Sequence, residues 1–203
     1  MKTHVLVVLF ALLCHASARA VTLVPAPPGI NADAYLLMDF VTGEVLVEHN
    51  IDTRLPPASL TKLMTSYILA EEVDAGRLSL DDEVTVSRNA WSQNPQFRGS
   101  SLMWIEPGKK VTVGELEQGI VISSGNDATV AIAEHIAGSE EAFVALMNSY
   151  AEELGLTATH FENTHGLPNS DHLTTARDLG ALHERHRQHI GRGPVLDHFG
   201  KEH

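Results

Sequence analysis

The order of apolar and polar residues predicts a strand hairpin followed by a helix. Residues 34–40 are strand-like, residues 44–49 alternate polar and apolar positions, and Thr42-Gly43 between them is a turn signal. After two consecutive prolines the apolar residues change to the three-and-four spacing of one helix face, at Leu60, Leu63, Met64, Tyr67 and Ile68. This spacing predicts a helix over residues 59–75.

Helical spacing returns in the second half of the chain. The predicted helices cover 113–122, 128–137 and 140–154, and a last one begins at Ala176. Thr112, Ser139 and Thr175 stand at helix starts, where their hydroxyls can cap a free backbone N–H group. Residues 80–87 are expected to be extended, and 159–173 to form an irregular loop.

The first twenty residues have the form of a secretory signal peptide. A charged start precedes an apolar run, and Ala18-Arg19-Ala20 has the spacing of a cleavage site. A membrane anchor is the alternative, but an apolar run of about ten residues is too short to cross a bilayer. We therefore expect cleavage after Ala20, a mature chain that starts at Val21, and export to the periplasm or cell envelope.

Composition limits the partners of the mature chain. Removing Lys2 and Arg19 from the 14 basic residues leaves 12, against 26 acidic residues. This acidic balance argues against nucleic acid as a partner. The only cysteine, Cys14, lies in the expected signal peptide, so the mature chain must be stable without disulfides.

Ser59 and Lys62 form the first candidate constellation. Three residues apart at a helix start, they lie on the same side of the helix. A serine hydroxyl becomes a useful nucleophile when a base takes its proton, and a lysine is such a base when its pKa is lowered. The alternative is an ordinary solvated helix surface, because serine and lysine are both common.

Ser124 and Asn126 form the second constellation, on the turn between two predicted helices. A hydroxyl and an amide two residues apart can point into one cleft, where the hydroxyl relays a proton and the amide holds a carbonyl or orients a lysine. The alternative for Asn126 is a helix cap.

The motifs occur together and in order. They are Pro57-Ala58-Ser59-Leu60-Thr61-Lys62, Gly99-Ser100-Ser101-Leu102-Met103, Ser123-Ser124-Gly125-Asn126-Asp127-Ala128, Leu146-Met147-Asn148-Ser149-Tyr150 and Thr164-His165-Gly166-Leu167. Over residues 34–179 the chain resembles the low-molecular-mass penicillin-binding proteins, which are serine-type D-alanyl-D-alanine carboxypeptidases with S-x-x-K, S-x-N and K-T-G motifs. The resemblance implies an α/β fold of the β-lactamase and transpeptidase-like class. An N-terminal β-hairpin and a helical subdomain are expected, with an incomplete sheet.

The resemblance also implies a role for each site residue. Ser59 would form the acyl-enzyme, Lys62 would act as its base, and Ser124 would pass a proton to the leaving D-alanine. Asn126 would bind substrate and position Lys62, and His165 would have a structural or substrate-contact role. The implied substrate is the D-Ala-D-Ala end of peptidoglycan pentapeptides, β-lactams are the implied inhibitors, and no metal or organic cofactor is implied.

The chain departs from the family pattern towards its end. No lysine is followed by Thr-Gly: neither the pair Lys109-Lys110 nor Lys201 completes a K-T-G motif. The resemblance stops near Leu179, so residues 21–179 are expected to be the N-terminal part of the catalytic domain. Residues 180–203 are expected to be a disordered or frame-shifted tail of a C-terminally truncated chain that lacks the family's membrane anchor.

Two consequences follow for function. The histidines of the tail, His183, His186 and His189, are read as solvated residues rather than metal ligands, because no cysteine accompanies them and residues six apart diverge on a helix. Without K-T-G this chain is expected to be a poor or inactive catalyst. The alternatives are a serine β-lactamase and a non-catalytic, truncated peptidoglycan-binding protein.

Overall fold

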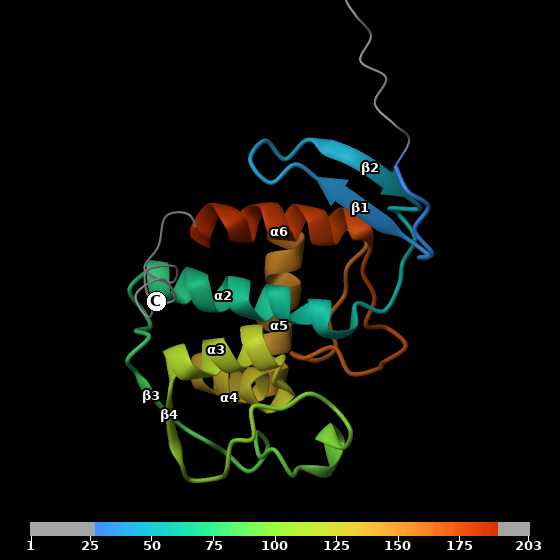
Figure 1. Ribbon diagram of the computed structural model, residues 1–203. Coiled ribbons are helices and arrows are strands. Elements are labelled where there is room, and N and C mark those ends of the chain that lie inside the picture. The colour runs from blue at the N-terminus through green and yellow to red at the C-terminus, as the bar shows by residue number, and fades with distance from the viewer. Residues whose placement is uncertain (1–26, 191–203) are drawn as a thin grey trace, which may run out of the picture. The chain divides into compact units, whose positions relative to one another are not determined.

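The computed structural model describes residues 27–190, so the expected signal peptide lies outside the described residues. Residues 27–31 carry no helix or strand. The helices and strands fall in residues 32–190 (Figure 1). They are β1 (Tyr35–Met38), β2 (Val45–His49), η1 (Ala58–Thr61), α2 (Lys62–Asp74), β3 (Glu83–Thr85), η2 (Pro95–Phe97), β4 (Lys110–Thr112), α3 (Val113–Ser123), α4 (Asn126–Ala137), α5 (Glu140–Glu153) and α6 (Ala176–Ile190).

The strands form two small antiparallel pairs. In the predicted hairpin, β1 pairs with β2 from Tyr35 opposite His49, and the register shifts between Leu37 and Met38. The second pair, β3 with β4, has Val84 opposite Val111. The expected α/β class with an incomplete sheet is therefore confirmed, whereas the strand β4 was not predicted from the residue pattern.

Helix α2 is the centre of the helical layer. Figure 1 shows it between α6 and α3, with α5 crossing behind. Residues 64–70 are all buried, so this helix is covered on nearly every side, as the core helix of a domain is. The predicted apolar face is only partly correct: Met64, Tyr67 and Ile68 are buried, but Leu60 is 59% exposed.

Two clusters of buried apolar side chains meet at α2. One joins α2, α3 and α4 to the β3–β4 pair, and includes Leu69, Val84, Phe97, Leu116 and Ile132. The other joins α2, α5 and α6, and includes Met64, Ile68, Phe143, Phe161 and Leu182. Because α2 contributes to both clusters, the residues at its start are fixed from several directions.

Three predicted caps are present. The Thr112 hydroxyl accepts from the Glu115 N–H, and the Glu115 carboxylate accepts from the Thr112 N–H, which is a capping box at the start of α3. Ser139 accepts from the N–H of Ala142 at the start of α5. Thr175 accepts from the N–H of Asp178 at the start of α6.

The expectation of a disordered tail from residue 180 is wrong for residues 180–190. Helix α6 continues through this point to Ile190. Leu182 is 1% exposed and His186 is 9% exposed, so both contribute to the packing against α2. Apolar residues are sparse in this segment, but Leu182 and His186 lie at helical spacing and both pack towards α2, so the expectation of a solvated His186 is wrong. Residues 191–203 lie outside the described residues.

None of the helices within residues 27–190 combines the length and the apolar character that a bilayer crossing requires.

Candidate active site

Ser59 lies in a strained turn at the head of α2. The preceding residue, Ala58, has φ 48°, a backbone conformation that costs a residue with a side chain on the order of 1 kcal/mol or more. The turn η1 is a 3-10 helix, so the predicted helix start is tighter than expected. It leaves Ser59 exposed and places Lys62 in the first turn of α2.

The amino group of Lys62 is buried and has three oxygen neighbours. Nζ donates to Oδ1 of Asn126 at 2.7 Å and to the backbone carbonyl of His165 at 2.9 Å. Oγ of Ser59 lies 3.4 Å away. Lys62 is 5% exposed, and this burial lowers its pKa from 10.5 to about 8, although the nearby carboxylate of Asp127 acts in the opposite direction.

These contacts make Lys62 suitable as a base. A neutral amine has two N–H donors and one lone pair, and the two closest acceptors, Asn126 Oδ1 and the His165 carbonyl, engage the two donors. The lone pair is then left for the third neighbour, the hydroxyl of Ser59. Since the pKa of Lys62 is about 8, a substantial fraction is neutral near that pH.

Asn126 acts as a ligand of Lys62 rather than as a helix cap. The N-cap of α4 is Gly125, which has no capping side chain, and the Asn126 amide instead points to Lys62. The alternative role of Asn126 as a helix cap is therefore wrong. Asn126 is 4% exposed, so its oxygen is shielded from competing water.

Asp127, which sequence reasoning left without a site role, fixes the loop beside the site. Its carboxylate accepts from the backbone N–H groups of Met103 and Trp104 at 2.8 Å, and from that of Ile105 at 3.1 Å. It is fully buried. Its place directly after Ser124-Gly125-Asn126 is the only sequence signal that pointed to it.

Ser124 lies at the end of α3 with φ 53°, in the left-handed region. Ser59, Lys62 and Ser124 all line one hollow of about 510 Å³ between α2, α3 and α6. The structure thus brings three of the predicted site residues to one cavity.

The fifth predicted residue, His165, contributes its backbone to the site. Its carbonyl is the second acceptor of Lys62. The next residue, Gly166, has φ 91°, and a Cβ there would overlap the backbone carbonyl group of Ala58. Only glycine allows the loop to approach the Ser59 turn this closely.

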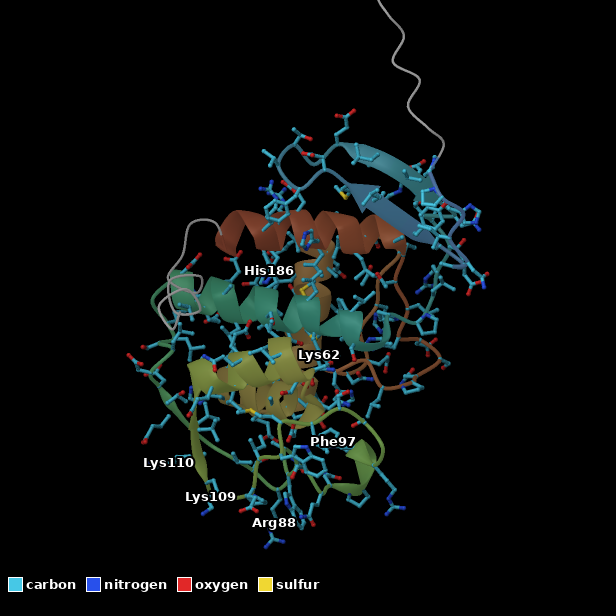
Figure 2. All side chains as sticks on the ribbon, viewed as in Figure 1. Lys62, Arg88, Phe97, Lys109, Lys110 and His186 are labelled. Atoms are coloured by element: carbon cyan, nitrogen blue, oxygen red, sulfur yellow. The ribbon has the colours of Figure 1, made fainter. Side chains whose placement is uncertain are left out.

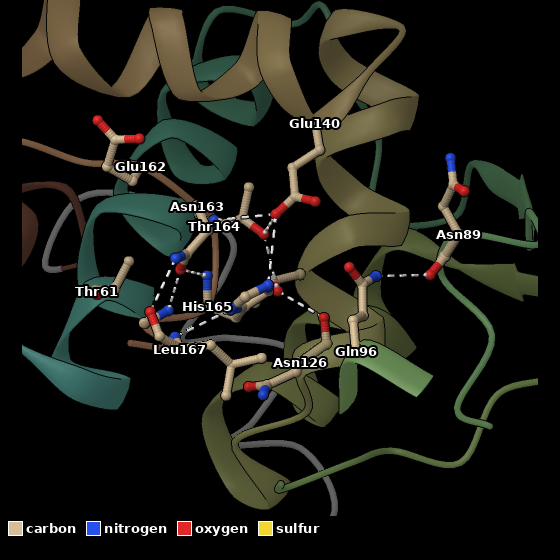
Figure 3. Close-up of polar contacts among 12 residues, drawn as sticks. Thr61, Asn89, Gln96, Asn126, Glu140, Glu162, Asn163, Thr164, His165 and Leu167 are labelled. Carbon is tan, nitrogen blue, oxygen red and sulfur yellow. Dashed lines mark hydrogen bonds and ion pairs between the residues drawn. The ribbon is translucent and has the colours of Figure 1, made fainter. Parts of the chain in front are cut away.

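The ring of His165 is buried and neutral. Nδ1 accepts from the backbone N–H of Leu167 at 3.1 Å, and Nε2 lies 3.6 Å from Oε1 of Glu140 (Figure 3). Burial lowers the pKa of His165 to about 3, with the charge of Lys62 acting in the same direction. His165 therefore places no second positive charge beside Lys62 at neutral pH.

His172 supports the Ser59 turn from outside. Its Nδ1 accepts from the backbone N–H of Glu162 at 2.9 Å, so in the neutral ring Nε2 carries the proton and donates to Oγ1 of Thr61 at 2.7 Å. Burial lowers the pKa of His172 to about 4, which keeps it neutral. No pattern in the sequence singled out this residue.

A buried carboxyl group, Glu117, also lines the hollow. It is 4% exposed and accepts from the hydroxyl of Ser66 at 3.3 Å. Burial raises the pKa of Glu117 to about 7. Within residues 27–190, no three His, Asp or Glu side chains gather closely enough to hold a metal ion.

The arrangement suits acyl transfer. An exposed serine lies next to a buried amine of lowered pKa, and the amine is oriented by an amide and a backbone carbonyl. In Figure 2 Lys62 lies between α2 and α3, and His186 lies between α6 and α2.

Comparison with known proteins gives consistent matches. The family described as D-alanyl-D-alanine carboxypeptidase, peptidase S11, matches residues 21–192. The D-alanyl-D-alanine carboxypeptidase DacC of Escherichia coli is 49% identical over 156 residues, which is 76% of this chain and 39% of that protein. DacF of Bacillus subtilis is 44% identical over 152 residues, which is 75% of this chain and 38% of that protein. This chain thus spans about 40% of the length of the curated relatives it matches.

Solved structures agree. Penicillin binding protein 6B from Escherichia coli matches with TM-score 0.78 and 45% identity, covering 87% of this chain and 55% of that one. Penicillin binding protein 5 from Haemophilus influenzae matches with TM-score 0.76 and 40% identity, covering 83% of this chain and 47% of that one. The fold is thus that of the penicillin-binding proteins, and the family match continues past the expected domain end at Leu179.

Proposed function

Because this chain belongs to the D-alanyl-D-alanine carboxypeptidase family, peptidase S11, we propose that Ser59 is the nucleophile of a serine-type carboxypeptidase. The substrate is the D-Ala-D-Ala end of a peptidoglycan pentapeptide, and the reaction removes the terminal D-alanine. The observation that carries the proposal is the placement of Lys62 Nζ between two acceptors and the Ser59 hydroxyl.

In the acylation step Ser59 Oγ attacks the carbonyl carbon of the penultimate D-alanine. Its proton passes to the amine of Lys62, which must be neutral at the start. The C–N bond to the terminal D-alanine then breaks, and the leaving nitrogen receives a proton through Ser124. Water finally hydrolyses the acyl-enzyme and restores the Ser59 hydroxyl.

The remaining site residues hold Lys62 in place. Asn126 and the His165 carbonyl fix the direction of the amine, so that its lone pair faces Ser59. Asn126 also contacts the substrate amide, and the His165 loop borders the cleft. No step needs a metal or an organic cofactor.

The relatives are bacterial cell-wall enzymes. For this chain we propose export, cleavage after Ala20, and action in the periplasm or cell envelope. β-Lactams react with the same serine, because their strained amide presents a carbonyl in place of the peptide.

The test is incubation of the purified chain with benzylpenicillin, followed by mass spectrometry. A stable penicilloyl adduct that Ser59→Ala removes supports the carboxypeptidase. Rapid release of penicilloic acid would instead indicate a serine β-lactamase. Absence of any adduct, together with retained binding to peptidoglycan, would indicate a non-catalytic binding protein. An intact Met1 on exported protein would contradict the signal peptide.

A further inference from the structure

The hollow beside Ser59 extends well beyond the catalytic groups. Its lining on η1 and α2 runs from Ser59 to Ala70, a rise of roughly 16 Å along the helix axis. On α3 the lining runs back from Ser124 to Glu117. Lys62 donates a hydrogen bond to Asn126, which follows the turn after α3, so Ser59, Lys62 and Ser124 lie at one end of this hollow, which we call the seam.

Away from that end the lining holds four polar side chains, Ser66 and Glu117 and, on α6, His183 and His186, and its remaining residues are apolar. The residues concerned are Leu60, Leu63, Leu69, Ala70, Ile120 and Val121. Leu69 and Ile120 are 1% and 3% exposed and form the floor, whereas Leu60 and Val121 are 59% and 61% exposed and form the rim. An apolar group lying here would remove both rim side chains from water.

The polar groups along the seam do not call for a charged or amide-rich ligand. Ser66 donates to Glu117, so these two groups satisfy each other. Burial raises the pKa of Glu117 to about 7, which shows that its apolar surroundings disfavour a charge. A hydrocarbon chain needs no hydrogen-bond partner, and each methylene group that it buries in the hollow favours binding.

We propose that the chain also cleaves esters of unbranched aliphatic acids, with the acyl chain in the hollow between α2, α3 and α6 and the carbonyl carbon at Ser59 Oγ. The inference rests on the proposed function, since Ser59 and Lys62 perform the chemistry. Ser59 Oγ bonds to the carbonyl carbon and its proton passes to Lys62. The C–O bond to the alcohol breaks with its electron pair on the alcohol oxygen, which takes the proton from Lys62. Water then releases the fatty acid.

The experiment uses p-nitrophenyl esters of acetate, butyrate, hexanoate and octanoate with the purified 203-residue chain. The acylation rate constant for octanoate should exceed that for acetate by at least about tenfold, since each fully buried methylene is worth up to about fourfold. Ser59→Ala gives the background, and peptide mapping locates the adduct.

Two neighbouring residues of α3 give a matched pair of variants. Val121 lines the hollow, whereas Ile122 is not among the described residues that line it and is 75% exposed. Val121→Asp should lower the octanoate-to-acetate ratio by at least about threefold, because the charge disfavours apolar burial, and Ile122→Asp should leave it within about 1.5-fold. Both variants add the same charge near the end of the same helix, so their helix-dipole costs match.

The outcomes separate the two proposals. A flat response to chain length, or an equal effect of the two aspartates, would overturn the acyl hollow while a penicilloyl adduct on Ser59 leaves the carboxypeptidase standing. Failure of both esters and benzylpenicillin to modify Ser59 would overturn both. Ester cleavage that continues in Ser59→Ala with the same chain-length preference would also overturn the inference.

Discussion

The backbone carbonyl of His165 lies 2.9 Å from Nζ of Lys62, although 103 positions separate the two residues. A loop carbonyl thus completes the environment of the predicted base. The sequence pattern pointed to His165 through its side chain, but the ring points away to Leu167 and Glu140. What the site takes from this residue is its main chain, held in place by the close approach of Gly166.

Gly166→Ala should therefore damage both stability and chemistry. A Cβ at Gly166 would overlap the Ala58 carbonyl and push the loop away from Lys62. We expect a loss of at least about 3 kcal/mol in unfolding free energy and at least about tenfold slower acylation of Ser59. Chemical denaturation and p-nitrophenyl acetate cleavage measure the two effects.

Gly155→Ala is the matched control. Gly155 also has a positive φ, 72°, but a Cβ there would meet nothing within 4 Å. Gly155→Ala should lower the free energy of unfolding by only about 1 kcal/mol and leave the acylation rate of Ser59 unchanged. Equal losses in the two variants would show that backbone conformation, and not the contact with Ala58, makes glycine necessary at 166.

Acylation of Ser59 should rise with pH through about 8. Burial lowers the pKa of Lys62 to about that value, and only the neutral amine can take the serine proton. The His165 ring is neutral above about pH 3, so it adds no titration in this range. Acylation rates between neutral and alkaline pH measure the profile, and a limb near the ordinary lysine pKa of 10.5 would contradict the account.

Asn126→Asp should move this limb upward by about one pH unit or more. The new carboxylate would lie against Lys62 Nζ and favour its charged form. Acylation near pH 8 should then fall about tenfold and recover at higher pH. Asn169→Asp adds the same charge at an exposed position and should leave the profile in place. A rate loss in Asn126→Asp without any shift would mean that Asn126 does not control the Lys62 pKa.

Glu117→Gln should stabilise the fold at alkaline pH. Burial raises the pKa of Glu117 from 4.5 to about 7, so the natural chain has full stability below about pH 4.5 and loses it as the pH rises through 7. Relative to the natural chain, Glu117→Gln should raise the free energy of unfolding by almost nothing at pH 4 and by on the order of 2–3 kcal/mol above pH 8.

Glu115→Gln is the opposite case on the same helix. Backbone and side-chain hydrogen bonds from Thr112 lower the pKa of the exposed Glu115. Its stabilising effect is present above the ordinary pKa of 4.5 and is lost as the pH falls through the lowered value, so glutamine should destabilise at neutral pH. Thermal unfolding curves across pH compare the two variants. Matching pH trends would refute the assignment of the buried charge to Glu117.

Local chemistry made much of the fold predictable. Thr112 and Ser139 correctly predicted helix starts. A helix cap depends only on hydrogen bonds between residues a few positions apart, which the sequence alone makes visible. The segment after Leu179 was misjudged because its packing depends on α2, far away in sequence, which covers Leu182 and His186.

In the candidate site, too, local features were predictable from the sequence and contacts between distant residues were not. The spacing of Ser59 and Lys62 already placed nucleophile and base on one side of a helix. The capping reading of Asn126, the buried carboxyl of Glu117 and the support of Thr61 by His172 were settled only by tertiary contacts. No periodicity in the sequence reports contacts of this kind.

The central claim is that Ser59 is the nucleophile and that Lys62 activates it. Its most direct test is peptide mapping of the chain after prolonged incubation with benzylpenicillin, beside Ser59→Ala and Lys62→Met. We predict one penicilloyl group, on the peptide that contains Ser59, absent in Ser59→Ala and slowed by at least about 100-fold in Lys62→Met, because nucleophile and base act as one unit. An adduct on another residue, or one that persists in Ser59→Ala, would contradict the account.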